Sequence, residues 1–286
     1  MRVAAGFVHK FTRSVKREIR AMKNGAVERQ ANALAVGFPH GRIAMKEDAG
    51  YATFSAADIG LAAPVSRLSQ LAQAWKADPA RSESDKPFLR NILQSQDLFE
   101  HKEILETALH EDLLGAVVRY LGQMPWLVNL QVWWTPPNQT TIRSQLYHYD
   151  HRDTRQAKVF LNLNDVGEDA GPLHFLPVPV SAKVDRTVGY SQDRYTDEQI
   201  ESCVTPAETM RTMGPAGAGF IVDTARCLHY GSRRNEKDRL LLMASFARAN
   251  CVSKGAGCEV LDPVRGRLVA DRFADDPARA FVVSAG

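Results

Sequence analysis

The sequence predicts a mainly β fold with flanking helices, in which a helical layer packs on a β-sandwich or jelly-roll barrel. Apolar residues recur at helical spacing through much of residues 1–125, whereas residues 126–255 consist of short β-rich runs separated by turn signals. Helices followed by many short strands are typical of this architecture. Because the strands need the helical cover, we expect a single domain over residues 1–286, with residues 256–286 as a C-terminal extension.

The first expected helix, over residues 11–22, carries most of the net charge. Its apolar residues recur every three or four positions with basic residues between them, which predicts an amphipathic helix. The net charge of the chain is +3, but residues 1–30 carry +6, so the remainder is slightly acidic. We expect this helix to pack on the body with its basic face in solvent. Binding of nucleic acid or a membrane surface by the helix is the alternative, but no nucleic-acid partner is expected for the body.

Two further helices are expected before the strands. One covers residues 56–75, with Ser55 as a possible cap. The other covers residues 102–121, where leucines recur on one side and Gly122 follows as a stop signal. These helices would supply the apolar faces that cover the barrel.

The β-rich runs begin after residue 125. Two prolines and an asparagine at 136–138, and glycines at 167 and 171, supply clear breaks between them. The expected strands cover residues 128–135, 143–149, 158–163, 220–222 and 240–246.

Composition excludes several classes of protein. At 44% hydrophobic and 24% charged residues, the chain matches an ordinary soluble globular protein. It contains no run of about 18 apolar residues, so no membrane span is expected. The four cysteines form no Cys-x-x-Cys pair, and the N-terminus lacks the apolar core of a secretory signal. We therefore expect free thiols and a cytoplasmic location.

The residues that indicate chemistry begin at His148. In a strand, His148 and Asp150 project to the same side, where an imidazole and a carboxylate can occupy adjacent positions on one metal ion. Far downstream, His229 follows another apolar strand. Two histidines and one carboxylate form the facial triad of non-heme Fe(II) oxygenases. His151 and Asp153 repeat the His-x-Asp spacing, but we prefer the first pair because it ends the apolar run.

A possible partner for a cosubstrate lies ten residues after His229. Arg239 opens an apolar strand, and a charged residue there needs a partner if it points inward. A guanidinium can hold a carboxylate through two parallel hydrogen bonds. The distal carboxylate of 2-oxoglutarate is a natural candidate.

The segment from about residue 129 to 247 resembles the phytanoyl-CoA dioxygenase family of Fe(II)/2-oxoglutarate-dependent oxygenases. The resemblance rests on His148, Asp150, His229, Ser232 and Arg239 in order, and on the connecting sequences KVFLNLNDV and GPLHFLP. It implies a double-stranded β-helix (jelly roll, cupin-like) in which the first three residues bind Fe(II), while Arg239 and Ser232 bind 2-oxoglutarate.

The resemblance also implies an activity. The expected reaction is hydroxylation, with O2, of a small-molecule substrate, and with release of succinate and CO2 from 2-oxoglutarate. Related halogenases lack a carboxylate at the position of Asp150, so its presence favours hydroxylation or another two-electron oxidation. The identity of the substrate and the oligomeric state stay open.

Several points depart from the family or have two interpretations. Residues 177–181 read PVPVS where the family often has PGSH, which favours an alternative function as a catalytically inactive jelly-roll binding module. Tyr230 separates His229 from Gly-Ser, which puts the cosubstrate contact of Ser232 in doubt. Trp133 and its neighbour Trp134 must face opposite sides of a strand, and either could line a substrate pocket. Tyr149 could contact substrate or simply pack in the barrel.

Overall fold

The computed structural model describes residues 25–81, 86–191, 193–249 and 263–284, together with the single residues 15, 19 and 251. Two antiparallel sheets dominate it. The larger sheet has the strand order β1-β7-β4-β9-β3-β2, and the smaller sheet has the order β6-β5-β8. The strands are β1 (Tyr51–Ser55), β2 (Arg90–Asn91), β3 (Pro125–Thr135), β4 (Gln156–Asn162), β5 (His174–Phe175), β6 (Met210–Arg211), β7 (Ala218–Val222), β8 (His229–Tyr230) and β9 (Arg239–Arg248).

The centre of the larger sheet consists of β4, β9 and β3. β9 is buried along its whole length and pairs with β3 on one side and β4 on the other. Alternate residues of these strands pack against the helices, and the others face the smaller sheet. The apolar run 240–246 forms part of β9, where both faces of the strand are covered, one by the helices and the other by the smaller sheet.

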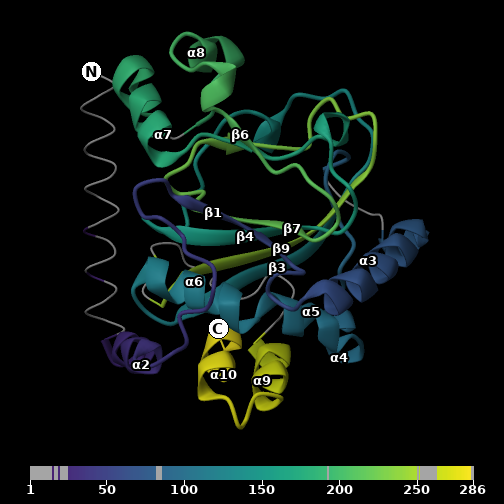
Figure 1. Ribbon diagram of the computed structural model, residues 1–286, viewed down its shortest axis with the longest axis vertical. Helices are drawn as coiled ribbons and strands as arrows, with labels where there is room; N and C mark the ends of the chain where they lie inside the picture. Colours follow the sequence, from purple (N-terminus) through teal and green to yellow (C-terminus); the bar gives the residue numbers. More distant parts are fainter. Residues whose placement is uncertain are drawn as a thin grey trace.

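Helices cover the outer face of the larger sheet. They are α2 (Gly25–Ala35), α3 (Ala62–Ala77), α4 (Asp97–Glu100), α5 (Lys102–Ala108), α6 (Glu111–Leu121), α9 (Pro263–Asp271) and α10 (Pro277–Val283), with α7 (Val178–Val184) and α8 (Asp197–Glu201) at the opposite end of the molecule (Figure 1). The helical layer is therefore not only N-terminal. The expected C-terminal extension supplies α10, whose Phe281 stacks on Trp126 of β3 at a centroid distance of 6.2 Å.

The helix predicted over residues 56–75 begins later than expected. Residues 51–55 form β1, and the backbone N–H of Ala56 continues the pairing by donating to Gly217. Gly60 then adopts the left-handed conformation, with φ of +81°. A helix cannot propagate through such a residue, so α3 begins at Ala62.

The helix predicted over residues 102–121 is two helices. His110 is extended between α5 and α6, and its ring accepts a hydrogen bond from the backbone N–H of Asp112. This capping interaction begins a new helix where the apolar periodicity alone had predicted continuity. The stop at Gly122 is as predicted, because this residue adopts the left-handed conformation, with φ of +75°.

The strand predicted over residues 143–149 is wrong in its first half. Arg143, with φ of +52°, begins a 3-10 turn that ends at Gln145. The buried Gln145 side chain donates to the carbonyl of Ser232 and to Asn138, which fixes the turn. Only isolated bridges follow, from Tyr147 to Tyr195 and from His148 to His229.

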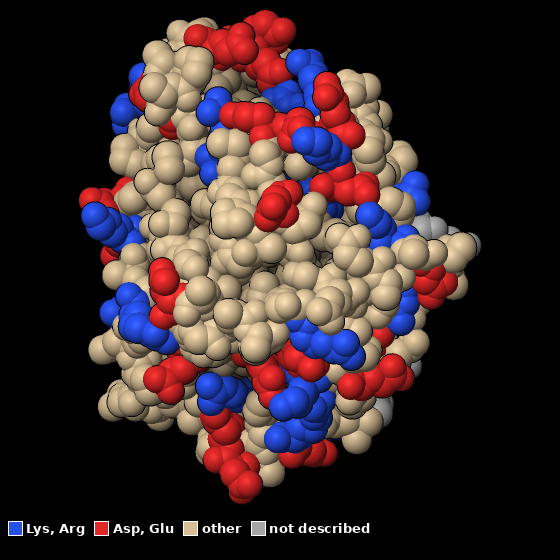
Figure 2. Space-filling view, turned by 45° about the vertical axis from the view of Figure 1, so that its right-hand side comes forward, with Lys and Arg blue, Asp and Glu red and all other residues tan. Residues whose placement is uncertain are grey.

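Two expectations concern the molecular surface. Of the helix predicted over residues 11–22, only Val15 and Ile19 are described, and both are exposed; the rest lies outside the described residues. None of the helices in the described ranges combines the length and apolar character required to cross a bilayer. On the face shown in Figure 2, acidic and basic side chains are intermixed around a largely uncharged centre.

Candidate functional site

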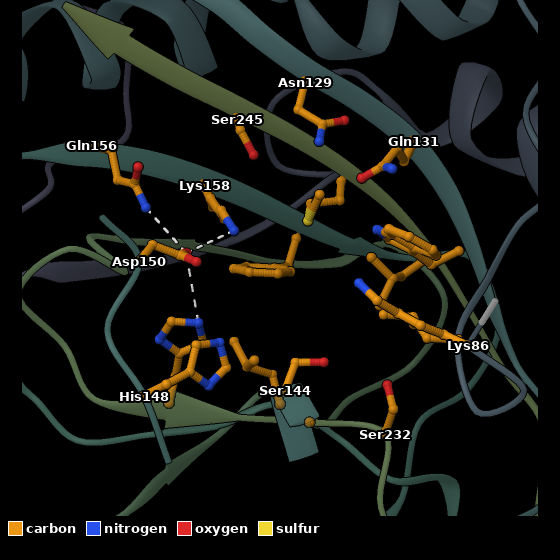
Figure 3. Close-up of a pocket in the computed structure, with 18 of the residues that line it drawn as sticks. Lys86, Asn129, Gln131, Ser144, His148, Asp150, Gln156, Lys158, Ser232 and Ser245 are labelled. Atoms are coloured by element: carbon orange, nitrogen blue, oxygen red, sulfur yellow. Dashed lines mark hydrogen bonds and ion pairs between the residues drawn. The ribbon is translucent and has the colours of Figure 1, made fainter. Parts of the chain in front are cut away.

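A cavity of about 520 Å³ lies between the two sheets. Its walls are the inner face of β3, β9 and β4 on one side, and β8 with the segment around residue 148 on the other. Figure 3 shows the polar side chains that point into it. The predicted metal ligands and Arg239 all line this one cavity.

The two histidines are brought together by a short bridge between distant segments. The backbone of His148 exchanges two hydrogen bonds of 3.1 Å with that of His229. Two residues on, the backbone N–H of Asp150 donates to the carbonyl of Thr224 at 2.9 Å. These bonds keep residues 147–150 extended, so His148 and Asp150 face the cavity while Tyr147 and Tyr149 face away. The predicted alternation holds although no continuous strand forms.

The three side chains have the geometry of a metal site. Ligand atoms of His148, Asp150 and His229 all lie within 4.8 Å of one another, and His229 Nε2 is 3.6 Å from Asp150 Oδ2. Nδ1 of His148 lies 2.8 Å from the carbonyl of Leu146, and Nδ1 of His229 lies 3.0 Å from that of Cys227. Hydrogen bonds from Nδ1–H to carbonyls orient each ring and leave Nε2 as the metal-binding atom.

The charge state of the cluster also suits a divalent cation. Burial lowers the pKa of His148, and it lowers that of His229 to about 3, so both rings are neutral at physiological pH. Burial opposes ionisation of Asp150, but the ammonium group of Lys158 and the nearby rings of His229 and His148 together hold the pKa of Asp150 well below its usual value. Two neutral imidazoles and one carboxylate are thus ready to bind a metal without releasing protons.

Polar residues around Asp150 hold its carboxylate in place. Lys158 Nζ lies 2.7 Å from Asp150 Oδ2, and Gln156 donates to the same oxygen at 3.0 Å (Figure 3). The Gln156 amide also donates to Thr224 Oγ1 at 2.6 Å. Both side chains come from β4, so the sheet fixes the carboxylate relative to the two histidines.

Arg239 has an unusual environment. Its residue is 3% exposed, and burial lowers its pKa to about 10, so it is still charged at neutral pH. Its described partners are hydroxyls: it donates to Ser232 Oγ at 2.6 Å and to Thr135 Oγ1 at 3.4 Å. Nε and Nη1 have no partner within the described part of the chain. A buried guanidinium that no carboxylate neutralises is the kind of group that a dianionic ligand would satisfy.

Ser232 lies beside this guanidinium despite the inserted Tyr230. Its backbone adopts φ of +63°, and its carbonyl accepts hydrogen bonds from Gln145 at 2.5 Å and Asn138 at 3.2 Å. These bonds hold a conformation that a non-glycine residue seldom adopts. The hydroxyl of Ser232 is thereby directed at Arg239.

Of the aromatic residues that the sequence offered for the pocket, one lines the cavity and the others do not. Trp133 lines the cavity, while Trp134 faces outward and donates from Nε1 to Asp238 at 2.9 Å. Tyr149, which the sequence left as either a substrate contact or a packing residue, does not line the cavity, and its side chain is buried on the other side of the segment. There it stacks on Tyr190 and donates to Asp185 at 3.1 Å.

The carboxylate of the second His-x-Asp motif has a structural function. Asp153 is fully buried and forms a bidentate ion pair with Arg248, with distances of 2.9 and 2.7 Å. This pair ties the chain after the metal cluster to the end of β9. The structure therefore supports the choice of His148 and Asp150 over their neighbours.

Replacement of Asp153 with alanine should destabilise the fold without removing the metal site. Breaking a buried ion pair on one side costs about 3–5 kcal/mol, because Arg248 is left charged and unpaired. Denaturant unfolding measures the loss, and Co(II) titration of the folded variant below its unfolding transition should give an affinity within threefold of wild type. Loss of Co(II) binding by folded protein would contradict this assignment.

A second buried carboxylate supports the loop that carries Thr224. Asp223 is fully buried and accepts hydrogen bonds from the Tyr120 hydroxyl at 2.5 Å and from the backbone N–H of Ala225 at 3.0 Å. Burial raises the pKa of Asp223 to about 6, although these hydrogen bonds oppose the shift. The folded state therefore holds the proton more tightly than the unfolded state does.

This shift predicts a pH dependence of stability. Because the folded pKa exceeds the unfolded value, the contribution of Asp223 is most favourable below about pH 4 and is lost as pH rises through about 6. Relative to Asp223→Asn, the unfolding free energy of the wild type should fall by about 2 kcal/mol between pH 4 and pH 7.5. Chemical denaturation of both proteins across this range measures the difference. A difference that stays constant with pH would exclude the proposed ionisation.

The sequence interpretation missed several residues of the cavity wall. They are polar side chains at alternating positions of otherwise apolar strands, which is the signal that could have identified them. They are Asn129, Gln131, Gln156, Lys158 and Ser245.

Comparisons with known proteins support the fold. No protein-family model and no curated protein matches the chain. Among solved structures, the chain is similar to EctD from S. alaskensis with 2-oxoglutarate and 5-hydroxyectoine, at 16% identity and a TM-score of 0.50, over 76% of this chain and 78% of EctD. It is also similar to the epimerase SnoN from nogalamycin biosynthesis in complex with Fe3+, alpha ketoglutarate and nogalamycin RO, at 17% identity and a TM-score of 0.47, over 83% and 94%.

At these identities the likeness concerns the fold. The antiparallel sheets match the double-stranded β-helix of Fe/2-oxoglutarate enzymes, so the predicted jelly roll is confirmed. Within this fold the chain carries a candidate His-Asp-His triad.

Proposed function

We propose that the protein is an Fe(II)/2-oxoglutarate-dependent oxygenase that hydroxylates a small molecule and releases succinate and CO2. The observation that carries this proposal is the combination, in one cavity, of the converging triad with a buried guanidinium that has only hydroxyl partners among the described residues. The triad and the guanidinium each fit one ligand. Neutral Nε2 atoms and a carboxylate suit Fe(II), and Arg239 suits the distal carboxylate of 2-oxoglutarate.

The residues of the chain would bind the metal ion, orient the cosubstrate and exclude water. His148, Asp150 and His229 would hold the metal ion through two imidazole nitrogens and a carboxylate oxygen. Bound Fe(II) would supply the activation of O2 that a side chain cannot provide. Arg239 and Ser232 would orient the cosubstrate through charge-assisted hydrogen bonds.

An apolar part of the sheet wall of the cavity would help to keep water from the reacting centre. Trp133 contributes to it together with apolar residues of β4 and β9, including Phe160, Leu241 and Met243. A wall of this kind lowers the local dielectric and strengthens the electrostatic contacts to the ligands.

The segment that suggested the alternative of an inactive binding module has a structural role beside the site. Residues 177–181, which differ from the family, lead into and begin α7. Ser181 in this helix donates to the carbonyl of Leu176 at 2.8 Å and accepts from the backbone N–H of Leu228 at 2.9 Å. The altered segment thus supports the residue before His229.

Spectroscopy and product analysis test the proposal. Anaerobic addition of Fe(II) and 2-oxoglutarate should produce a visible metal-to-ligand charge-transfer band, and exposure to O2 should convert 2-oxoglutarate to succinate. A protein that gives no band under these conditions is not an oxygenase of this class. A band without any succinate, in the presence of a binding small molecule, would favour the binding module.

A further inference from the structure

One wall of the cavity is polar where the centre of a sheet is normally apolar. Asn129 on β3, Ser245 on β9 and Lys158 on β4 are register partners across the three neighbouring strands, so their side chains form a row on the inner face. Gln131 follows on β3 at the next inward-facing position. Figure 3 shows these four side chains directed into the cavity, across from His148.

Two of these side chains have unsatisfied hydrogen-bonding atoms. Gln131 is 7% exposed and Ser245 is 5% exposed, and Gln131 Oε1 and Ser245 Oγ have no partner among the residues that the structure describes. Each unsatisfied buried polar atom costs about 1–3 kcal/mol. An apolar residue at either position would pack without this cost, so a ligand that hydrogen-bonds to both side chains accounts for their presence.

Lys158 adds a positive charge to the same row. Its side chain is 19% exposed, and its ion-pair partner in the described ranges is Asp150. A metal ion bound to Asp150 would compete for that carboxylate, so the ammonium group would then need another anion. The lining of the cavity contains three further cations, Lys86, Arg152 and Arg239, and Asp150 is the sole acidic residue among the described lining residues.

We infer that Gln131, Ser245 and Lys158 form a subsite that binds a carboxylate group of the substrate. This inference rests on the proposed oxygenase function and names the substrate class: a small carboxylic acid whose oxidised carbon lies a short distance from the anionic group. The subsite is separate from the cosubstrate anchor. Ser245 and Arg239 lie on the same face of β9, six residues or about 20 Å of strand apart, so the two groups serve different anions.

Matched ligands of equal length test the charge requirement. The probes are butanoate, hexanoate and octanoate, each paired with its primary amide, titrated calorimetrically into anaerobic enzyme saturated with Fe(II) and 2-oxoglutarate. At least one carboxylate should bind the wild type tenfold or more tightly than its amide. In Lys158→Gln this preference should fall below threefold. Ser245→Ala and Gln131→Leu should each weaken binding of the carboxylate by about five- to tenfold.

Two controls establish that the effect is specific to this subsite. Lys237→Gln changes an exposed lysine that pairs with Asp169, and it should leave the preference for carboxylates unchanged. The dissociation constant of 2-oxoglutarate, measured from the charge-transfer band, should change less than threefold in Ser245→Ala and Gln131→Leu.

Three results would overturn the inference. They are the absence of any carboxylate preference in the wild type, an undiminished preference in Lys158→Gln, and a loss of 2-oxoglutarate affinity in Ser245→Ala as large as that in Arg239→Gln. With a normal charge-transfer band, each of these leaves the oxygenase proposal intact. Absence of the band refutes the oxygenase proposal and this inference together.

Discussion

Replacement of Asp150 with alanine is expected to abolish turnover and to lower Fe(II) affinity by more than a hundredfold. Loss of a neighbour that merely orients a ligand costs 10- to 100-fold in metal affinity, so loss of a ligand itself should cost more. The variant also leaves Lys158 without its ion-pair partner. An unpaired ammonium group next to two imidazoles would repel the incoming cation. Anaerobic Fe(II) titration and the charge-transfer band with 2-oxoglutarate measure both effects.

A double variant separates the lost ligand from the unpaired charge. Asp150→Ala alone should destabilise the fold by roughly 1–3 kcal/mol because a half-buried charge loses its partner. Asp150→Ala combined with Lys158→Met should recover most of that stability but should not restore the charge-transfer band. Recovery of the band in the double variant would show that Asp150 only neutralises Lys158 and is not a metal ligand.

The sequence predicted the order of the helices and strands better than the residues at which each of them begins and ends. The apolar run 240–246 was predicted to be a strand, and β9 contains it. Helical periodicity continues through residues 102–121, however, although the capping contact of His110 divides the helix. Similarly, the helix expected from residue 56 begins later because Ala56 completes a pairing with Gly217. Contacts of this kind join residues far apart in the sequence or depend on one side-chain rotamer, so the periodicity of apolar residues does not predict them.

For the candidate site too, the sequence identified some residues and not others. His148, Asp150 and His229 were identifiable because metal ligation restricts the residue types and their order. Tyr149, in contrast, was placed in the pocket as a possibility although its position between two inward-facing residues directs it outward. Lys158 was seen only as part of a β-rich run, since nothing local indicates that its ammonium group lies 2.7 Å from Asp150.

Replacement of Arg239 with methionine should raise the stability of the protein while it removes cosubstrate binding. The wild-type guanidinium is 3% exposed and has only hydroxyl partners among the described residues, so its burial costs free energy that no carboxylate repays. An apolar side chain of similar length should therefore increase the unfolding free energy by about 1–4 kcal/mol. The dissociation constant of 2-oxoglutarate should rise about a hundredfold, because losing one partner of a buried charge pair costs about 2–5 kcal/mol.

The sign of the stability change distinguishes a ligand-binding arginine from a structural one. Arg233 is the matched control, because its buried guanidinium already pairs with Asp197 through two bonds of 2.8 and 2.9 Å. Arg233→Met should lower the unfolding free energy, since Asp197 loses its partner, and it should leave 2-oxoglutarate affinity within threefold of wild type. Denaturant unfolding without ligands and anaerobic titration of the Fe(II) protein measure the two quantities. If Arg239→Met instead destabilises the protein and retains 2-oxoglutarate affinity, Arg239 is part of the core, and the cosubstrate carboxylate binds elsewhere.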